Sequence, residues 1–234
     1  MKLGIMQPYY LPYIGYWQLL SAVDTYVIYD DVNYINRGWI NRNRILIDGK
    51  PAYFNVPMLK ASQNKKIDEI QVNADAGLRK KNLRTLEMAY KKAPYFQEVF
   101  PLAEKIINSE ETLLSEYLAD SIAVICGYLD IKTKRLMSSS IAKNNELKGQ
   151  DKILEICRLL GADEYYNAEG GQKLYSYEKF QAEGIQLKFL KCREIRYRQF
   201  GEQFEPNLSI IDVLMFNSKN TVLEMLSDYE LITK

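Results

Sequence analysis

The sequence predicts an α/β protein with a mainly parallel, Rossmann-like sheet flanked by helices and with a β-hairpin insertion. Short apolar runs alternate with helical patterns of about 10–15 residues, which is typical of right-handed strand–helix–strand crossovers. The dipeptide Asp48-Gly49 lies between two apolar runs and indicates the hairpin. The 234 residues show no repeat, linker or low-complexity tract, so we expect one domain spanning residues 1–234.

Each predicted element rests on local composition. Strands are expected where β-branched and aromatic residues cluster, and helices where apolar residues recur with a helical period. Pro8 ends the first strand, and Pro94 interrupts a long helical pattern. The predicted strands are 2–6, 25–29, 45–47, 52–56, 133–137, 164–167 and 186–190, and the predicted helices are 15–23, 78–107, 110–129, 150–160, 175–183, 209–216 and 221–227.

The charge balance and the absence of histidine exclude several classes of function. With 31 Lys and Arg against 30 Asp and Glu, the net charge of +1 gives no general attraction to nucleic acid or to an acidic membrane. Without histidine there can be no Ser-His-Asp or Cys-His catalysis and no H-E-x-x-H zinc site. Proton transfer near neutral pH must therefore use carboxylates, Lys, Tyr, Cys or the substrate.

The cysteines and the N-terminal residues indicate a cytoplasmic protein. Cys126, Cys157 and Cys192 form no C-x-x-C pair, and we expect buried, inert thiols. The first residues lack the apolar core of a signal peptide, and no run reaches the ~18 apolar residues of a membrane helix. We therefore expect a cytoplasmic location and no membrane insertion.

Polar and glycine residues follow the predicted parallel strands, which is where ligands bind in open α/β sheets. The connections at the other edge of the predicted sheet, such as residues 129–131 and 161–163, are short and have no comparable group of polar residues. This asymmetry favours a site at the carboxyl edge of the sheet, although polar loops are common on any protein surface. The candidates at that edge are Gln7, Tyr9, Tyr13, Asp30, Asp31, Asn33, Ser139, Glu169, Gly170 and Gly171.

Asp30 and Asp31 are the main acidic candidates. Adjacent carboxylates at a strand end could hold Mg²⁺, or one could act as a base with its pKa raised by the other. The alternative is a solvated turn in which Asp31 caps the backbone. Residues 138–140 (SSS) could donate hydrogen bonds to a phosphate, or they could form an ordinary capping turn. Residues 169–171 (EGG) would permit close approach of the backbone to a ligand.

The segment from Asn36 to Arg44 (NRGWINRNR) contains the densest group of candidate binding side chains. Its arginines have the fork geometry that suits carboxylate or phosphate, its asparagines add neutral donors and acceptors, and its tryptophan offers a flat face. We expect it to recognise a small anionic substrate. The alternative is a polar hairpin face whose arginines pair with Asp30 and Asp31. The candidates are Arg37, Trp39, Asn41, Arg42, Asn43 and Arg44.

Several motifs together resemble the WbqC-like protein family. They are IMQPYYLPYIGYW at 5–17, YDDVNYINRGWINRNRI at 29–45, AYKKAPYF at 89–96, YYNAEGG at 165–171 and FEPNLSIID at 204–212. The resemblance spans essentially the whole chain. It implies a bacterial protein of O-antigen, capsule or other surface-polysaccharide (lipopolysaccharide) biosynthesis, in a family whose members are sometimes described as glycine or aminoacyl transferases.

The opening of the chain is also similar to that of nucleotidylyltransferase-like α/β domains. In those domains a strand leads through a proline-containing loop to an H-x-G-H motif at the start of a helix. Tyr13, Gly15 and Tyr16 occupy the first, third and fourth positions of that motif here. Because both histidines are replaced, the likeness implies nucleotide binding and not nucleotidyl transfer by the usual means.

These observations lead to three functional hypotheses. The first is a transferase of surface-glycan assembly, for example one that moves an aminoacyl, glycyl or other acyl group from an activated amino acid or similar donor to an activated amino sugar. Asp30 or Asp31 would be its base, the arginines would hold phosphate or carboxylate, and Glu169 and Asp212 are further candidates. The second is a non-catalytic module that binds a nucleotide-sugar or a glycan. The third, nucleic-acid binding, is disfavoured by the near-neutral charge, so we expect no nucleic-acid partner.

Overall fold

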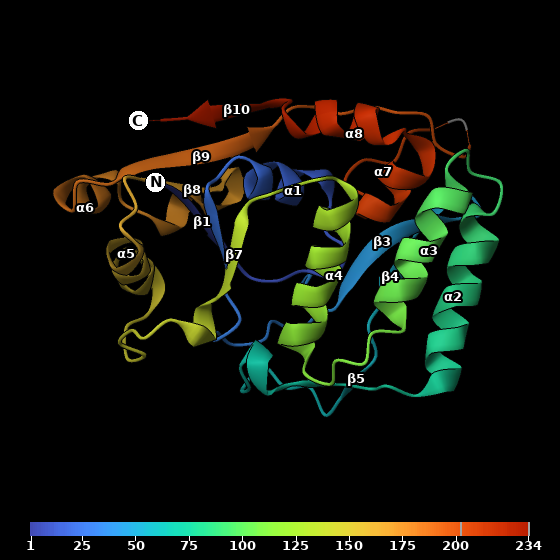
Figure 1. Ribbon diagram of the computed structural model, residues 1–234, viewed down its shortest axis with the longest axis horizontal. Coiled ribbons are helices and arrows are strands. Elements are labelled where there is room, and N and C mark those ends of the chain that lie inside the picture. The colour runs from blue at the N-terminus through green and yellow to red at the C-terminus, as the bar shows by residue number, and fades with distance from the viewer. Residues whose placement is uncertain (202, 234) are drawn as a thin grey trace.

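The computed structural model, which describes residues 1–201 and 203–233, contains a six-stranded sheet (Figure 1). Its strands are β1 (Lys2–Met6), β2 (Thr25–Ile28), β7 (Lys134–Met137), β8 (Glu164–Ala168), β9 (Gln186–Cys192) and β10 (Tyr229–Ile232). The order across the sheet is β10-β9-β8-β1-β2-β7. All neighbouring pairs are parallel except β9 and β10, so the antiparallel partner lies at one edge.

The direction of winding changes between β1 and β8. From β1 the chain passes to β2 and β7 on one side, and it then returns to form β8 and β9 on the other side. In open α/β sheets, ligands bind in the crevice at such a switch point, beyond the carboxyl ends of the strands. The topology therefore singles out the ends of β1 and β8.

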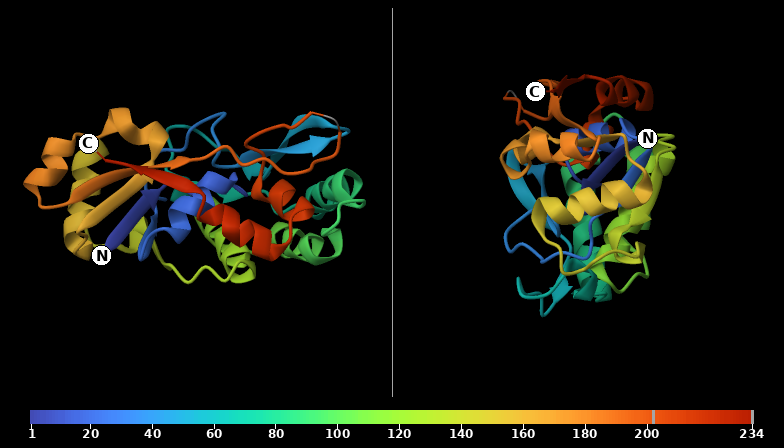
Figure 2. Two further views of the ribbon diagram at one scale, coloured as in Figure 1. Left: turned by 90° about the horizontal axis from the view of Figure 1, so that it is seen from above. Right: turned by 90° about the vertical axis from the view of Figure 1, so that its left-hand side faces the viewer.

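Helices cover both faces of the sheet (Figures 1 and 2). They are α1 (Ile14–Ser21), α2 (Ala76–Tyr90), α3 (Phe96–Ile107), α4 (Leu114–Tyr128), α5 (Gly149–Leu160), α6 (Tyr177–Ala182), α7 (Ile210–Phe216) and α8 (Lys219–Leu226). Helices α1, α4, α7 and α8 contribute to a large core, whereas α5 and α6 contribute to a smaller one. Tyr26 and Ile28 enter the large core and Val27 the smaller one, because side chains alternate along a strand. No helix in the described part of the chain combines the length and apolar character needed to cross a bilayer.

A hairpin of β3 (Arg42–Ile47) and β4 (Lys50–Asn55) forms a separate small sheet. Asp48 and Gly49 make its two-residue turn, with φ angles of 50° and 72°. Both angles lie in the left-handed region that primed hairpin turns require, and Asp and Gly adopt this region at low cost. A shorter pair, β5 (Met58–Leu59) with β6 (Gln71–Val72), follows along the chain.

The predicted fold class is confirmed: the sheet is mostly parallel, helices flank it, and the hairpin is present. The helical pattern at 78–107 is two helices, α2 and α3, and the segment between them contains Pro94. The strands β5, β6 and β10 do not follow from the sequence pattern. Each is only two to four residues long, which is too short for an alternating pattern to be recognised.

Candidate functional site

A cavity of about 590 Å³ opens at the carboxyl ends of β1 and β8, at the switch point of the sheet. We call it the switch-point cavity. Its walls come from the end of β1 and the loop after it, from α1, from the end of β2, from the segment after β8 and from the start of α5. Its described lining residues are Ile5, Met6, Gln7, Tyr9, Tyr13, Gly15, Tyr16, Leu19, Tyr29, Ile35, Gly149, Gln150, Ile153, Asn167, Ala168, Gly170, Gly171, Leu174 and Tyr175.

The lining is mainly apolar, with tyrosine rings and aliphatic side chains, and it includes the side-chain amides of three residues. None of the described lining residues is Asp, Glu, Lys or Arg. Tyrosine rings provide flat walls, and Gln7, Gln150 and Asn167 provide neutral hydrogen-bonding groups. A lining of this kind suits a planar or ring-shaped ligand with polar edges.

Tyr9 and Tyr13 belong to the loop after β1. Tyr13 lies over Gly15, because a Cβ atom at Gly15 would be 2.5 Å from the Tyr13 ring. Only glycine permits this approach at the start of α1. Burial raises the pKa of Tyr9 and of Tyr13. Both hydroxyls therefore stay protonated near neutral pH and can donate hydrogen bonds.

Asn167 and Gly171 form part of the wall that follows β8. Asn167 Nδ2 donates to the Tyr165 hydroxyl at 2.6 Å and lies 3.4 Å from the Tyr175 hydroxyl. A Cβ atom at Gly171 would lie 2.7 Å from Asn167 Oδ1, whereas one at Gly170 would meet nothing within 4 Å. Gly171 therefore has a steric role in this wall that its neighbour does not share.

Asp30 and Asp31 lie outside the described lining of this cavity and are bound to other groups. Asp30 accepts hydrogen bonds from the Ser139 backbone N–H at 2.9 Å and from the Ser139 hydroxyl at 2.6 Å. Asp31 Oδ2 lies 2.9 Å from Nζ of both Lys143 and Lys152. The interpretation that the hairpin arginines pair with these carboxylates is wrong, because a serine binds Asp30 and lysines bind Asp31.

The lysine pair makes Asp31 a weak base. Burial alone would raise the pKa of Asp31, but hydrogen bonds from Lys143 and Lys152 outweigh it and lower the pKa to about 2. A carboxylate of so low a pKa accepts protons poorly near neutral pH. General-base catalysis by Asp30 or Asp31 stays a prediction, and the contacts of Asp31 favour a role in holding the two lysines. Among the described residues, no three His, Cys, Asp or Glu side chains are grouped so as to hold a metal ion.

Most polar side chains of the segment from Asn36 to Arg44, which we call the hairpin segment, bind groups within the protein. Arg42 Nε donates to the Gly38 carbonyl at 3.0 Å, and the Arg42 guanidinium stacks 4.2 Å from the Tyr53 ring centre. Asn41 and Asn43 bind a hydroxyl and backbone carbonyls. These contacts give rigidity to the segment and leave few of its groups free for a ligand.

A second cavity, of about 340 Å³, lies between this segment and the loop after β1. We call it the hairpin cavity. The Arg44 guanidinium in its wall lies 2.9 Å from the Glu205 carboxylate, which balances the charge of the arginine. Its described lining residues are Tyr9, Pro12, Tyr13, Trp39, Asn43, Arg44 and Asn207.

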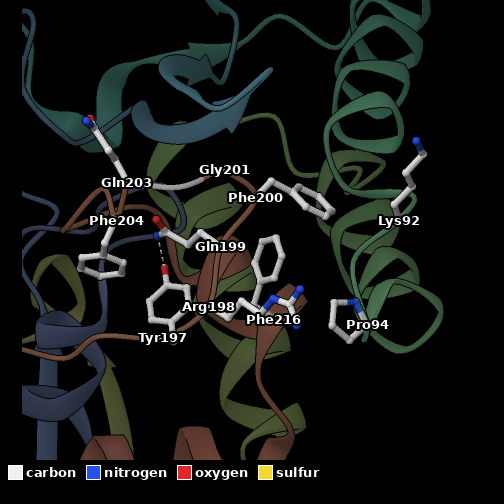
Figure 3. Close-up of a pocket in the computed structure, with 10 residues that line it drawn as sticks. All are labelled: Lys92, Pro94, Tyr197, Arg198, Gln199, Phe200, Gly201, Gln203, Phe204 and Phe216. Atoms are coloured by element: carbon white, nitrogen blue, oxygen red, sulfur yellow. Dashed lines mark hydrogen bonds between the residues drawn. The ribbon is translucent and has the colours of Figure 1, made fainter.

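A third cavity, of about 590 Å³, shares none of its described lining residues with the other two (Figure 3). In its wall Gln199 donates to the Tyr197 hydroxyl at 3.1 Å, and Tyr197 donates to Asp212 at 2.7 Å. Asp212 is fully buried, and burial raises its pKa. This predicted binding residue therefore links the segment around Tyr197 to α7 and lines none of the three cavities.

The structure brings together part of the predicted site. The switch-point cavity has Gln7, Tyr9, Tyr13, Gly170 and Gly171 in its wall, and the hairpin cavity has Tyr9, Tyr13, Trp39, Asn43 and Arg44. The remaining predicted residues lie elsewhere. Asn33, Arg37 and Glu169 are exposed, Asn41 is bound to Tyr34 and Val56, and Arg42 is bound to the Gly38 carbonyl. Asp30 and Ser139 line a further cavity of about 660 Å³ and bond to each other next to Asp31, and Asp212 is in the core.

Sequence reasoning missed several residues of the site. Tyr29 and Tyr175 line the cavity but look like ordinary strand and helix residues in the sequence. Gln150 could have been found, because it stands at the start of the helix that leads to a central parallel strand. The sequence around Lys143 and Lys152 does not predict their ion pairs with Asp31, because these pairs form only when the folded chain buries the lysines next to it.

The fold and the cavities define an α/β protein with a large cavity at the switch point of its sheet. The chain belongs to the WbqC-like protein family, whose model matches residues 7–224. The uncharacterized protein Rv1507c of Mycobacterium tuberculosis is 32% identical over 219 residues, which cover 92% of this chain and 93% of that protein. No solved structure matches the chain.

Replacing Asp31 with asparagine is expected to lower the free energy of unfolding by about 3–5 kcal/mol at pH 7, because two buried ammonium groups would lose their counter-charge. Urea unfolding measures this loss. The control is Glu194→Gln, which breaks an exposed pair with Arg196 and should change stability little. A loss for Asp31→Asn no larger than that of the control would contradict the expectation.

The same ion pairs predict an acid-sensitive part of the stability. Folding lowers the pKa of Asp31 from its ordinary value of 3.8 to about 2. The pairs therefore stabilise the folded state above about pH 4 and lose this contribution, about 2 kcal/mol, as the pH falls towards 2. The difference in unfolding free energy between the wild type and Asp31→Asn should narrow over this interval. A difference that stays constant would show that Asp31 does not titrate as these contacts require.

Proposed function

We propose that the protein is a transferase that binds a nucleotide-activated amino sugar in the switch-point cavity and passes an acyl or aminoacyl group to the amine of that sugar. The observation that supports this most strongly is the place of the cavity, beyond the ends of β1 and β8 where the strand order reverses. Its volume of about 590 Å³ is in the range of small-molecule and cofactor sites.

The lining supports a nucleotide as one part of the ligand. Tyrosine rings can stack on a nucleobase, and the side-chain amides of Gln150 and Asn167 can pair with its polar edge. Helix α5 begins in the wall with Gly149 and Gln150. The positive end of its dipole and its free backbone N–H groups would favour the phosphates of such a ligand.

The proposed reaction requires hydrogen-bond donors more than a strong base. A neutral amine attacks the carbonyl carbon of an activated acyl group, a C–N bond forms, and the carbonyl electron pair moves to the oxygen. When the carbonyl re-forms, the bond to the leaving group breaks, the leaving group keeps the electron pair, and the nitrogen loses a proton to it or to water. A protonated hydroxyl of Tyr9 or Tyr13 would stabilise the negative oxygen, and the cavity would hold the amine in place.

The biological setting is part of the same proposal. A role in O-antigen, capsule or other surface-glycan assembly rests on the resemblance of the motifs at 5–17 and 29–45 to the WbqC-like family. A cytoplasmic location agrees with three unpaired cysteines. Burial raises the pKa of Cys126 to about 11 and that of Cys157 to about 12, so neither thiol is activated as a nucleophile.

A second candidate function is a module that binds a nucleotide-sugar or a glycan without catalysis. The observation that favours it is the absence of any acid, lysine or arginine from the described lining of the switch-point cavity. In this case the ligand would bind and leave unchanged, and the protein would act within a biosynthetic complex.

Incubation with nucleotide-activated amino sugars and acyl donors should separate the two functions. The panel would contain uridine, thymidine and guanosine diphosphate amino sugars, each with coenzyme A thioesters or aminoacyl adenylates as donors. The transferase proposal expects a product whose mass equals the amino sugar plus the acyl group, detected by mass spectrometry. Calorimetric binding of an amino sugar with no product from any donor would favour the binding module, and no binding of any nucleotide would contradict both.

The two neighbouring glycines provide a matched test of the cavity. Gly171→Ala should weaken nucleotide-sugar binding by about tenfold or more, because its Cβ would displace the Asn167 amide from the wall. Gly170→Ala should change the affinity by less than about threefold, because its Cβ meets open space. Isothermal calorimetry and the thermal midpoint of both variants would be measured together. Equal affinities for the two folded variants would exclude the Asn167 wall from the binding site.

A further inference from the structure

The two cavities on either side of the loop after β1 share a wall. Tyr9 and Tyr13 line both the switch-point cavity and the hairpin cavity. The two cavities are therefore adjacent, and Tyr9 and Tyr13 belong to the wall of each. The proposed function uses the first cavity and leaves the second, of about 340 Å³, without a role.

Trp39 is the most exposed ring in the wall of the hairpin cavity, with 42% of the residue accessible. Its backbone is nevertheless held in place. Tyr10 N–H donates to the neighbouring Ile40 carbonyl at 3.0 Å, and Arg42 Nε donates to the Gly38 carbonyl at 3.0 Å. Because hydrogen bonds already fix the backbone around this ring, stacking of a ligand ring on it would lose little conformational entropy.

The polar groups of the hairpin cavity suit an uncharged ring. The Arg44 guanidinium is paired with Glu205 at 2.9 Å and also donates to the Pro206 carbonyl at 3.1 Å, so it offers little net charge. Its Nε has no partner among the described residues. The exposed Asn207 amide and the hydroxyls of Tyr9 and Tyr13 add further neutral groups. Flat aromatic faces with neutral donors match a ring that carries several hydroxyl groups.

We infer that the hairpin cavity is the sugar subsite, in which Trp39 stacks on the sugar ring of the ligand whose nucleotide fills the switch-point cavity. The inference rests on the proposed function and deepens it. It places the amine of the sugar beside Tyr9 and Tyr13, which form the shared wall. Trp39 is then a specificity residue that distinguishes a nucleotide-sugar from the bare nucleotide.

Calorimetry with a nucleotide and its matching nucleotide-sugar tests this assignment. Uridine diphosphate and uridine diphosphate glucosamine, which carries a free amine, form one such pair, and the thymidine and guanosine pairs would be measured in the same way. In Trp39→Ala the affinity for the nucleotide-sugar should fall by about tenfold, while that for the nucleotide changes by less than about twofold. Trp39→Tyr keeps a flat ring and should recover most of the loss. Because Trp39 is exposed, unchanged thermal midpoints are expected for both variants.

Fluorescence gives an independent measurement. The chain has two tryptophans, and Trp17 is fully buried. Quenching by acrylamide therefore reports on Trp39, and a bound sugar ring should protect it. Trp39→Phe removes the accessible signal and serves as the control.

The outcomes distinguish failure of this inference from failure of the proposed function. Equal losses of affinity for nucleotide and nucleotide-sugar in Trp39→Ala, or no loss for either, would overturn the sugar subsite and leave nucleotide binding intact. If no nucleotide binds the wild type, the proposed function fails, and the sugar subsite fails with it because it was inferred for the sugar of a bound nucleotide-sugar.

Discussion

The reversal of strand order between β1 and β8 is the constraint on which the candidate site depends. The connections that follow β1 and β8 run to opposite sides of the sheet. No crossover therefore covers the carboxyl ends of these two strands, and a crevice stays open between them. The loop after β1 lines this crevice and also contacts the hairpin segment, where the Tyr10 N–H donates to the Ile40 carbonyl. One short segment, residues 7–13, therefore contributes to two cavities at once.

Three charged side chains of the candidate site are bound to groups within the protein. Asp31 neutralises part of a buried lysine pair, Arg44 is tied to Glu205, and Arg42 packs on Tyr53. The described lining of the switch-point cavity instead consists of tyrosine rings, aliphatic side chains, amides and glycines. The proposed recognition by stacking and by neutral hydrogen bonds rests on this division, and α5 would be the source of the field that an anionic group experiences.

The sheet could be predicted because its strands and helices alternate with regular length. The rule that ligands bind beyond the carboxyl ends of strands then led to Gln7, Tyr9 and Tyr13, which do line a cavity. The partners of charged residues could not be predicted, because they depend on distant contacts. Asp31 meets Lys152 across 121 positions of the chain. A guanidinium in a motif likewise gives no sign of whether it faces a ligand or, as for Arg42, a tyrosine of its own hairpin.

All ionisable side chains in the described lining of the switch-point cavity are tyrosines, and this sets the charge of the cavity. Burial raises the pKa of each of its tyrosines above the ordinary value of 10.0, and the described lining contains no ionisable side chain of another kind; these tyrosines are Tyr9, Tyr13, Tyr16, Tyr29 and Tyr175. The tyrosines therefore stay protonated, and the charge of the cavity lining is the same in mildly acidic and mildly alkaline solution. A change in ligand affinity with pH between those limits would come from titration of the phosphate or amine of the ligand, because the charge of the cavity lining stays constant.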